Sequence, residues 1–260
     1  MRLLQLGPGD ELTLTKDLKQ DLPPYAILSH TWGNESDEVT FRDLMENTGK
    51  NKPGYEKIVF CGRQAHTDNL NHFWVDTCCI DKTSSAELTE SIISMFNWYR
   101  NAKICYVYLA DVSRDECGQS EISRATWQPA FRRSKWFTRG WTLQELLAPE
   151  SVRFFDQHGS PLGDKAILKQ QVCDITGIAE TALLGVPLTD FKVSERYEWA
   201  RGRQTAREED WAYSLQGIFG VFFSPQYGEG RTNAVRRLIK EIKEILLDGE
   251  MQGFIIGMGS

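Results

Sequence analysis

The chain has 260 residues, of which 41% are hydrophobic and 25% are charged, a composition typical of soluble globular proteins. Its formal net charge of −6 provides no general attraction to phosphate backbones or anionic lipids, so DNA is not an expected partner. No stretch approaches the roughly 20 consecutive apolar residues of a membrane-spanning helix, so no membrane span is expected.

The first 160 residues alternate between strand and helix patterns. A GPGD turn between two alternating segments predicts a β-hairpin in residues 1–18. Near-continuous apolar runs predict buried strands at 25–30, 73–80, 103–112 and 151–156. Helical periodicity predicts helices within 54–70, 81–102, 127–137 and 141–148, with a polar loop at 113–124. This order favours an α/β fold with a mostly parallel sheet flanked by helices.

From about residue 160 the pattern becomes helical. Apolar periodicity predicts helices in 164–177, 193–203, 205–220 and 231–247. Two helices have predicted capping boxes, Ser84 with Glu87 and Thr205 with Glu208. No linker-like segment divides the chain. We therefore expect one domain over 1–248, with an α/β core (1–160), a helical C-terminal extension (161–248) and a flexible tail (249–260), or a tail that pairs with other chains.

Polar and aromatic side chains follow the predicted strands. The first strand ends in SHTWG (29–33), the second in DTCCID (76–81), and the third runs into Asp111. Ligands of open parallel α/β sheets bind beyond the carboxyl ends of the strands, so a pocket is expected where these segments converge. Each residue also has a structural interpretation. His30 at a strand end is commonly a hydrogen-bonded structural residue, and a buried Asp76 needs a partner such as Arg139.

The arrangement of the cysteines and the absence of common sequence motifs make several kinds of site unexpected. Cys78 and Cys79 would face opposite sides of a strand, and buried cysteine usually serves as a small hydrophobic side chain. Adjacent cysteines and four scattered histidines predict no metal site. The sequence has no GxGxxG, P-loop or GxSxG motif. Without a secretory signal or a CxxC pair, we expect reduced thiols and a cytoplasmic protein.

Three ordered blocks resemble a known family. YAILSHTWG (25–33), FWVDTCCIDK (73–82) and WFTRGWTLQELLAP (136–149) are similar to the signature blocks of the fungal heterokaryon-incompatibility (HET) domain. REEDWAYSLQGIFGV (207–221) and YGEGR (227–231) extend the resemblance over roughly residues 23 to 235. The resemblance implies a cell-death effector that responds to non-self, as at the N-terminus of NLR-type incompatibility proteins. It also implies remote kinship with TIR domains, which are flavodoxin-like and of which some cleave NAD.

The TIR resemblance points to one carboxylate. Trp141-Thr142-Leu143-Gln144-Glu145-Leu146 resembles the plant TIR helix Trp-Cys-Leu-x-Glu-Leu, with threonine in place of cysteine, which puts Glu145 at the catalytic position. A carboxylate beside the ribose would stabilise an oxocarbenium-like transition state. The remaining pocket residues that this assignment implies are Ser29, His30, Trp32, Gly33, Asp76, Cys78, Arg139 and Trp141. Against it, Thr142 and Glu145 have the spacing of a capping box, in which Glu145 would have only a structural role.

Three functions therefore stay open. The first is a TIR-like NAD hydrolase, for which NAD is a substrate and no cofactor is needed, with self-association on activation and an NLR-type protein or module as partner. The second is a non-catalytic signalling module that works by oligomerising. The third is a cysteine hydrolase using Cys78 or Cys79 with His30, for which no local signature exists.

Overall fold

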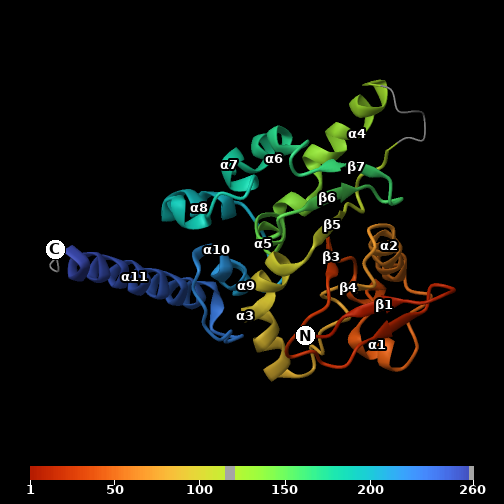
Figure 1. The fold of residues 1–260 in the computed structure, drawn as a ribbon, viewed down its shortest axis with the longest axis horizontal. Helices are drawn as coiled ribbons and strands as arrows, with labels where there is room; N and C mark the ends of the chain where they lie inside the picture. Colours follow the sequence, from red (N-terminus) through yellow and green to blue (C-terminus); the bar gives the residue numbers. More distant parts are fainter. Residues whose placement is uncertain (115–120, 258–260) are drawn as a thin grey trace.

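A seven-stranded mixed sheet forms the centre of the computed structural model, which describes residues 1–114 and 121–257 (Figure 1). The strands run in the order β2-β1-β4-β3-β5-β6-β7. Their bounds are β1 Leu4–Leu6, β2 Leu12–Leu14, β3 Tyr25–His30, β4 His72–Trp74, β5 Ile104–Tyr108, β6 Val152–Phe155 and β7 Pro161–Asp164. The central strands β4, β3, β5 and β6 are parallel, whereas β1, β2 and β7 join antiparallel at the edges. The α/β class and the N-terminal hairpin are confirmed, but the sheet is mixed.

The parallel strands have an order that creates a crevice. In chain order they are β3, β4, β5 and β6, and β3 lies between β4 and β5. The chain therefore goes from β3 to β4 on one side of β3 and then crosses back to β5 on the other side. At such a reversal the connections leave on opposite faces, which opens a binding crevice at the carboxyl ends of the two strands. His30, the last residue of β3, lies at this point.

The predicted strand over 73–80 is wrong beyond Trp74. After β4 ends at Trp74 the chain folds into a turn, in which Cys79 N donates to Val75 O at 2.9 Å and Val75 N donates to Cys79 Sγ at 3.4 Å. These local bonds replace the sheet bonds that a longer strand would need. Cys78 and Cys79 consequently do not face opposite sides of a strand, and both are buried.

Helices of the α/β half cover both faces of the sheet. Their bounds are α1 Phe41–Met45, α2 Gly54–Thr67, α3 Ser85–Asn101, α4 Glu121–Arg133 and α5 Thr142–Leu147, with short 3-10 helices η1 Glu35–Asp37 and η2 Lys135–Thr138. In Figure 1, α2 lies on one side of the sheet and α3 and α5 on the other. Residues 121–124 are helical where a loop was expected, and residues 115–120 of that loop lie outside the described residues.

The C-terminal half is helical, as predicted, and all of its helices except the last are shorter than the periodicity indicates. The helices are α6 Lys169–Thr176, α7 Glu180–Leu183, α8 Val193–Ala200, α9 Asp210–Tyr213, α10 Gln216–Phe219 and α11 Gly230–Gly257, with η3 Leu188–Asp190. The single helix expected over 205–220 is divided into α9 and α10. Thr205 forms no capping box, because its hydroxyl donates to Arg207 O and α9 begins only at Asp210.

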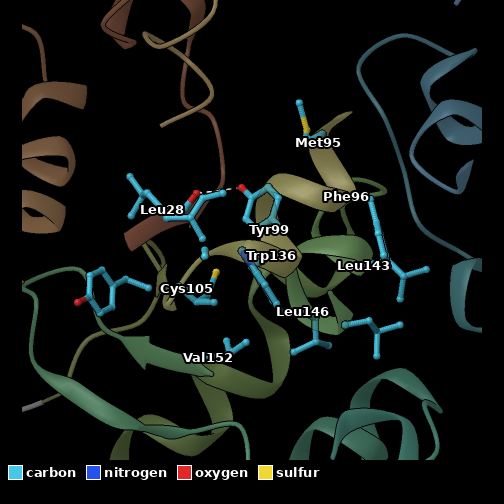
Figure 2. Close-up of a cluster of buried hydrophobic side chains, with 14 of the residues drawn as sticks. Leu28, Met95, Phe96, Tyr99, Cys105, Trp136, Leu143, Leu146 and Val152 are labelled. Carbon is cyan, nitrogen blue, oxygen red and sulfur yellow. Dashed lines mark hydrogen bonds between the residues drawn. The ribbon is translucent and has the colours of Figure 1, made fainter. Parts of the chain in front are cut away.

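The two halves share one hydrophobic core. Figure 2 shows side chains from β3, α3, β5, η2, α5 and β6 gathered in one cluster, with Trp136 at its centre. The helical half adds to this core, since α10 packs on α3 and α7 packs on α5. Gly217 of α10 lies so close to Phe96 of α3 that a β-carbon would overlap the ring. The helical half therefore fixes the positions of α3 and α5.

The last helix extends away from the body of the protein (Figure 1). It continues to Gly257, past the boundary at 248 predicted for the folded part, and residues 258–260 lie outside the described residues. Ile239, Ile245, Leu246 and Leu247 are exposed on it. Within the described chain, no helix combines the length and apolarity that crossing a membrane requires.

Candidate functional site

The carboxylate of Glu145 is held inside the protein by a chain of hydrogen bonds. Ser29 Oγ donates to Glu145 Oε2 at 2.5 Å, and Trp136 Nε1 donates to Ser29 Oγ at 2.8 Å. Glu145 is 6% exposed and Ser29 is fully buried. The three residues come from α5, β3 and η2, so the carboxylate is fixed by parts of the chain more than a hundred residues apart. Ser29 is therefore a positioning residue here, because its hydroxyl is already committed on both sides.

The alternative interpretation, in which Glu145 caps α5, is wrong. Trp141 is the residue that precedes the first turn of α5, and it makes no side-chain capping bond. Thr142 lies inside the helix, where its hydroxyl donates to Trp136 O at 2.7 Å. A capping box needs a side-chain oxygen on the residue that begins the helix. It also needs a glutamate whose carboxylate accepts from the backbone N–H of that same residue. Neither part is present, so the burial of Glu145 has no capping function to explain it.

Burial makes Glu145 a weak acid. Removal from water disfavours the charged form and raises the pKa of Glu145 to about 8, and the nearby Asp76 carboxylate adds to the increase. The hydrogen bond from Ser29 acts in the opposite direction, because it stabilises the carboxylate. At neutral pH the group is therefore mostly protonated. A cation placed beside it would favour its ionisation.

Ser29→Ala is expected to raise the pKa of Glu145 further, because the serine hydroxyl stabilises the ionised carboxylate and would be removed. The titration of the glutamate carboxyl carbon in NMR spectra measures this directly. Ser91→Ala, at another buried serine on α3, provides the matched control and should leave the pKa of Glu145 unchanged. An unchanged midpoint in Ser29→Ala would show that the bond does not form in solution.

Two buried cations hold the helix that carries Glu145. Arg203 Nη1 donates to Arg139 O at 2.9 Å and to Thr142 Oγ1 at 3.1 Å, at the start of α5. Lys165 Nζ donates to Leu146 O at 3.2 Å and Pro149 O at 2.8 Å, at its end. Lys165 provides a donor for carbonyl groups at the end of the short helix, and Arg203 adds a donor to oxygens of Arg139 and Thr142 that already bond to each other. No sequence pattern indicates either residue, because these partners lie 16 to 64 residues away along the chain.

A second polar cluster lies on the opposite face of the sheet, near the carboxyl end of β3. Successive side chains of a strand point to opposite faces, so His30 points away from Ser29 and towards α2. Its Nε2 lies 4.0 Å from Glu38 Oε2 and 3.8 Å from Asp76 Oδ1. Lys57 Nζ of α2 donates to Glu38 Oε1 at 2.6 Å, and Gly33 N donates to the same oxygen at 2.6 Å. Burial lowers the pKa of His30 well below its ordinary value, and burial raises the pKa of Asp76.

Trp32 closes this cluster towards solvent. Its Nε1 donates to Asp76 Oδ2 at 2.9 Å, so Trp32 is the hydrogen-bond partner that Asp76 requires, in place of Arg139. The indole is 41% exposed. Lys82 Nζ lies 3.8 Å from the centre of its ring, and the guanidinium carbon of Arg139 lies 6.0 Å from it. An aromatic face and two cations thus meet at the crevice between β3 and its neighbours.

Some of the predicted pocket residues lie elsewhere. Trp141 is half-buried, and its side chain bonds to Asp210 of α9. Cys78 is fully buried, and among the described residues no hydrogen bond joins it or Cys79 to His30. Besides Arg203 and Lys165, the sequence patterns did not indicate Glu38, Lys57, Lys82 and Trp136. Trp136 belongs to a signature block and could have been considered, whereas Glu38 and Lys57 are ordinary members of polar segments.

Comparison with known proteins identifies the family. Residues 25–132 match the family model described as heterokaryon incompatibility protein (HET). Over 243 residues, 93% of this chain, the sequence is 51% identical to the vegetative incompatibility protein HET-E-1 of Podospora anserina. The chain belongs to the HET family. The similarity covers only 18% of the length of HET-E-1, so this HET domain corresponds to a small part of that protein.

The site residues lie within the segments that these matches cover. The first two signature blocks, with Ser29, His30, Trp32 and Asp76, lie inside the segment that matches the HET model. The third block, with Arg139 and Glu145, lies beyond it, but an alignment over 93% of the chain includes this block. No solved structure matches this HET domain, so the geometry described above is the basis for its chemistry.

Proposed function

We propose that this HET domain is a cell-death effector of vegetative incompatibility that acts as a TIR-like NAD glycohydrolase, with Glu145 as its catalytic carboxylate. The observation that carries the proposal is the buried Glu145, fixed by Ser29 and Trp136 at the reversal of strand order, without a capping role. Strongly perturbed carboxyl groups in such positions are characteristic of active sites. The match to HET-E-1 supports the role in incompatibility.

The TIR-like part of the proposal rests on topology and one motif. The four parallel strands follow the order 2-1-3-4 of flavodoxin-like sheets, and their antiparallel neighbours lie outside this unit. The motif WTLQEL forms α5 with its preceding residue, and it places Glu145 against the end of the first parallel strand. Both features are those expected of a TIR-like nucleotide site.

The chemistry fits the surroundings of Glu145. Cleavage of the bond between nicotinamide and ribose develops positive charge on the sugar, which a carboxylate stabilises. The positively charged nicotinamide ring would favour ionisation of Glu145 on binding. Lys82 and Arg139 beside Trp32 supply charge for the diphosphate, and the exposed indole supplies a face for stacking. Binding of the cationic substrate would therefore shift Glu145 towards the charged form that stabilises the transition state.

One observation favours a second function, a module that signals by oligomerising. The exposed apolar residues of α11, Ile239, Ile245 and Leu246 among them, are available for association. Self-association and attachment to an NLR-type protein are part of both proposals, since assembly can also activate an enzyme. The cysteine hydrolase is disfavoured, because burial raises the pKa of Cys79 well above its ordinary value and a thiolate is needed for attack.

The test is nicotinamide release from NAD by the purified protein at high concentration. We expect release by the wild type, with a rate that rises with pH through the titration of Glu145, whose pKa is about 8. Cys78→Ser and Cys79→Ser should retain the activity. Absence of release under every assembly condition would contradict the enzyme and leave the oligomerising module.

A further inference from the structure

Three buried polar atoms face one another without a hydrogen-bond partner in the described part of the chain. They are His30 Nε2, Glu38 Oε2 and Asp76 Oδ1. The nitrogen lies 4.0 Å from the first oxygen and 3.8 Å from the second, too far for direct hydrogen bonds. An unsatisfied buried polar group costs about 1–3 kcal/mol. The fold therefore maintains a set of hydrogen-bonding positions that it does not use itself.

Each carboxylate is fixed by its other oxygen. Lys57 and Gly33 donate to Glu38 Oε1, and Trp32 donates to Asp76 Oδ2. The side chains of His30 and Glu38 are 2% and 7% exposed, so neither can turn towards water. Asp76, at 19%, is the most accessible of the three and lies under the exposed indole of Trp32. A ligand that reaches the cluster would enter from this side.

The cluster selects the chemistry of its ligand. Two fixed carboxylate oxygens require two donors close together. A cationic donor is disfavoured, because Lys57, Lys82 and Arg139 all lie near enough to influence His30. A metal ion is disfavoured as well, since the described residues contain no group of three side chains placed to hold one. The same cations favour a neutral donor pair that is attached to an anion. Adjacent hydroxyls of a ribose phosphate meet all of these requirements.

We propose that His30, Glu38 and Asp76 form a subsite for the vicinal diol of a nucleotide ribose. The inference rests on the proposed function and adds to it a set of residues that recognise the sugar. The two carboxylates accept from the two hydroxyls, and the neutral imidazole bonds to one of them. Lys82 and Arg139, which both lie near the ring of Trp32, bind the attached phosphates. Asp76, whose charge also acts on Glu145, connects this subsite with the catalytic carboxylate.

The experiment measures nucleotide affinity by calorimetry in the Glu145→Gln protein, where binding can be followed without turnover. The probes are ADP and 2′-deoxy-ADP for the adenosine ribose, and nicotinamide mononucleotide and its 2′-deoxy form for the other ribose. We expect the deoxy compound of one pair to bind at least about tenfold more weakly, the equivalent of one hydrogen-bond partner lost. The pair that shows the difference identifies which ribose occupies the subsite.

Asp76→Asn is the deciding variant. It keeps the bond from Trp32 but presents an amide donor where the diol requires an acceptor, so the ratio between ribo and deoxy affinities should fall to within about threefold. Asp81→Asn removes the same charge from the same segment, at a carboxylate that bonds to Thr83, and should retain the ratio. If Asp76→Asn fails to fold, as thermal unfolding would show, His30→Gln takes its place with the same expectation.

The outcomes separate the two proposals. Equal affinities for the ribo and deoxy forms in both pairs, or a full ratio in Asp76→Asn, would overturn the diol subsite while nucleotide binding still supported the proposed function. Failure of every nucleotide to bind would overturn both. A ratio of ribo to deoxy affinities that falls in Asp76→Asn and is kept in Asp81→Asn would support the subsite.

Discussion

Glu145→Gln is expected to abolish nicotinamide release and, at neutral pH, to make the folded protein more stable. Glutamine has nearly the same shape and still accepts the bond from Ser29, but it cannot supply a negative charge to the sugar. Loss of an electrostatic stabiliser of the transition state costs about 10²- to 10³-fold in rate. The catalytic effect is measured by nicotinamide release from NAD, and the stability effect by thermal or denaturant unfolding.

The gain in stability follows from the raised pKa of Glu145. Its carboxyl titrates near 4.5 in the unfolded chain and at about 8 in the folded protein. Between these values the unfolded state ionises while the folded state keeps its proton, so stability falls as pH rises, by up to about 1.4 kcal/mol per pH unit. Glutamine has no proton to lose and escapes this loss. We expect a gain of roughly 2–3 kcal/mol at pH 7 that disappears near pH 4.5.

Glu150→Gln is the matched control for both effects. It removes the same charge five residues further along, at an exposed position, and should change neither the rate nor the pH dependence of stability substantially. Parallel stability curves for the wild type and Glu145→Gln would show that Glu145 is not buried as a protonated acid. Unchanged release would place the chemistry at another residue.

Arg203→Met is expected to lower the stability by about 3 kcal/mol and to reduce nicotinamide release. The guanidinium of Arg203 donates to Trp199 O, Arg139 O and Thr142 Oγ1, and methionine would fill much of its volume while leaving all three without this donor. The start of α5 would then be held less firmly, and the carboxylate of Glu145 with it. Thermal unfolding should record a decrease of roughly 6–12 °C.

Arg201→Met tests whether the loss of stability in Arg203→Met comes from the position of the arginine or only from the removal of a positive charge. Arg201 lies two residues earlier with its side chain 76% exposed, in a surface ion pair with Glu198. Such pairs contribute about 0–1 kcal/mol, so this variant should unfold close to the wild type. Similar losses in the two variants would contradict the clamping role of Arg203.

The strands and the main helices could be read from the sequence where the pattern was long and regular. Six buried residues in succession identify β3, and the stripe of Ile92, Met95, Phe96 and Tyr99 identifies α3. Periodicity failed where short-range hydrogen bonds replaced regular ones. The turn at Val75–Cys79 interrupted a predicted strand, and the segment before Asp210 interrupted a predicted helix. At Val75–Cys79 apolar residues are buried without regular secondary structure, which periodicity does not detect.

For Glu145, the sequence alone determined its place in a motif at the start of a short helix, together with two competing roles. Thr142 and Glu145 have the spacing of a cap, and spacing does not show which residue begins the helix. Only the tertiary structure decided between the roles, because β3 brings Ser29 to the carboxylate and η2 brings Trp136 to Ser29. The same applies to Glu38 and Asp76, which meet at His30 from two separate segments. Local sequence specifies backbone conformation, whereas the burial that changes the acidity of Glu145 arises from segments distant in the chain.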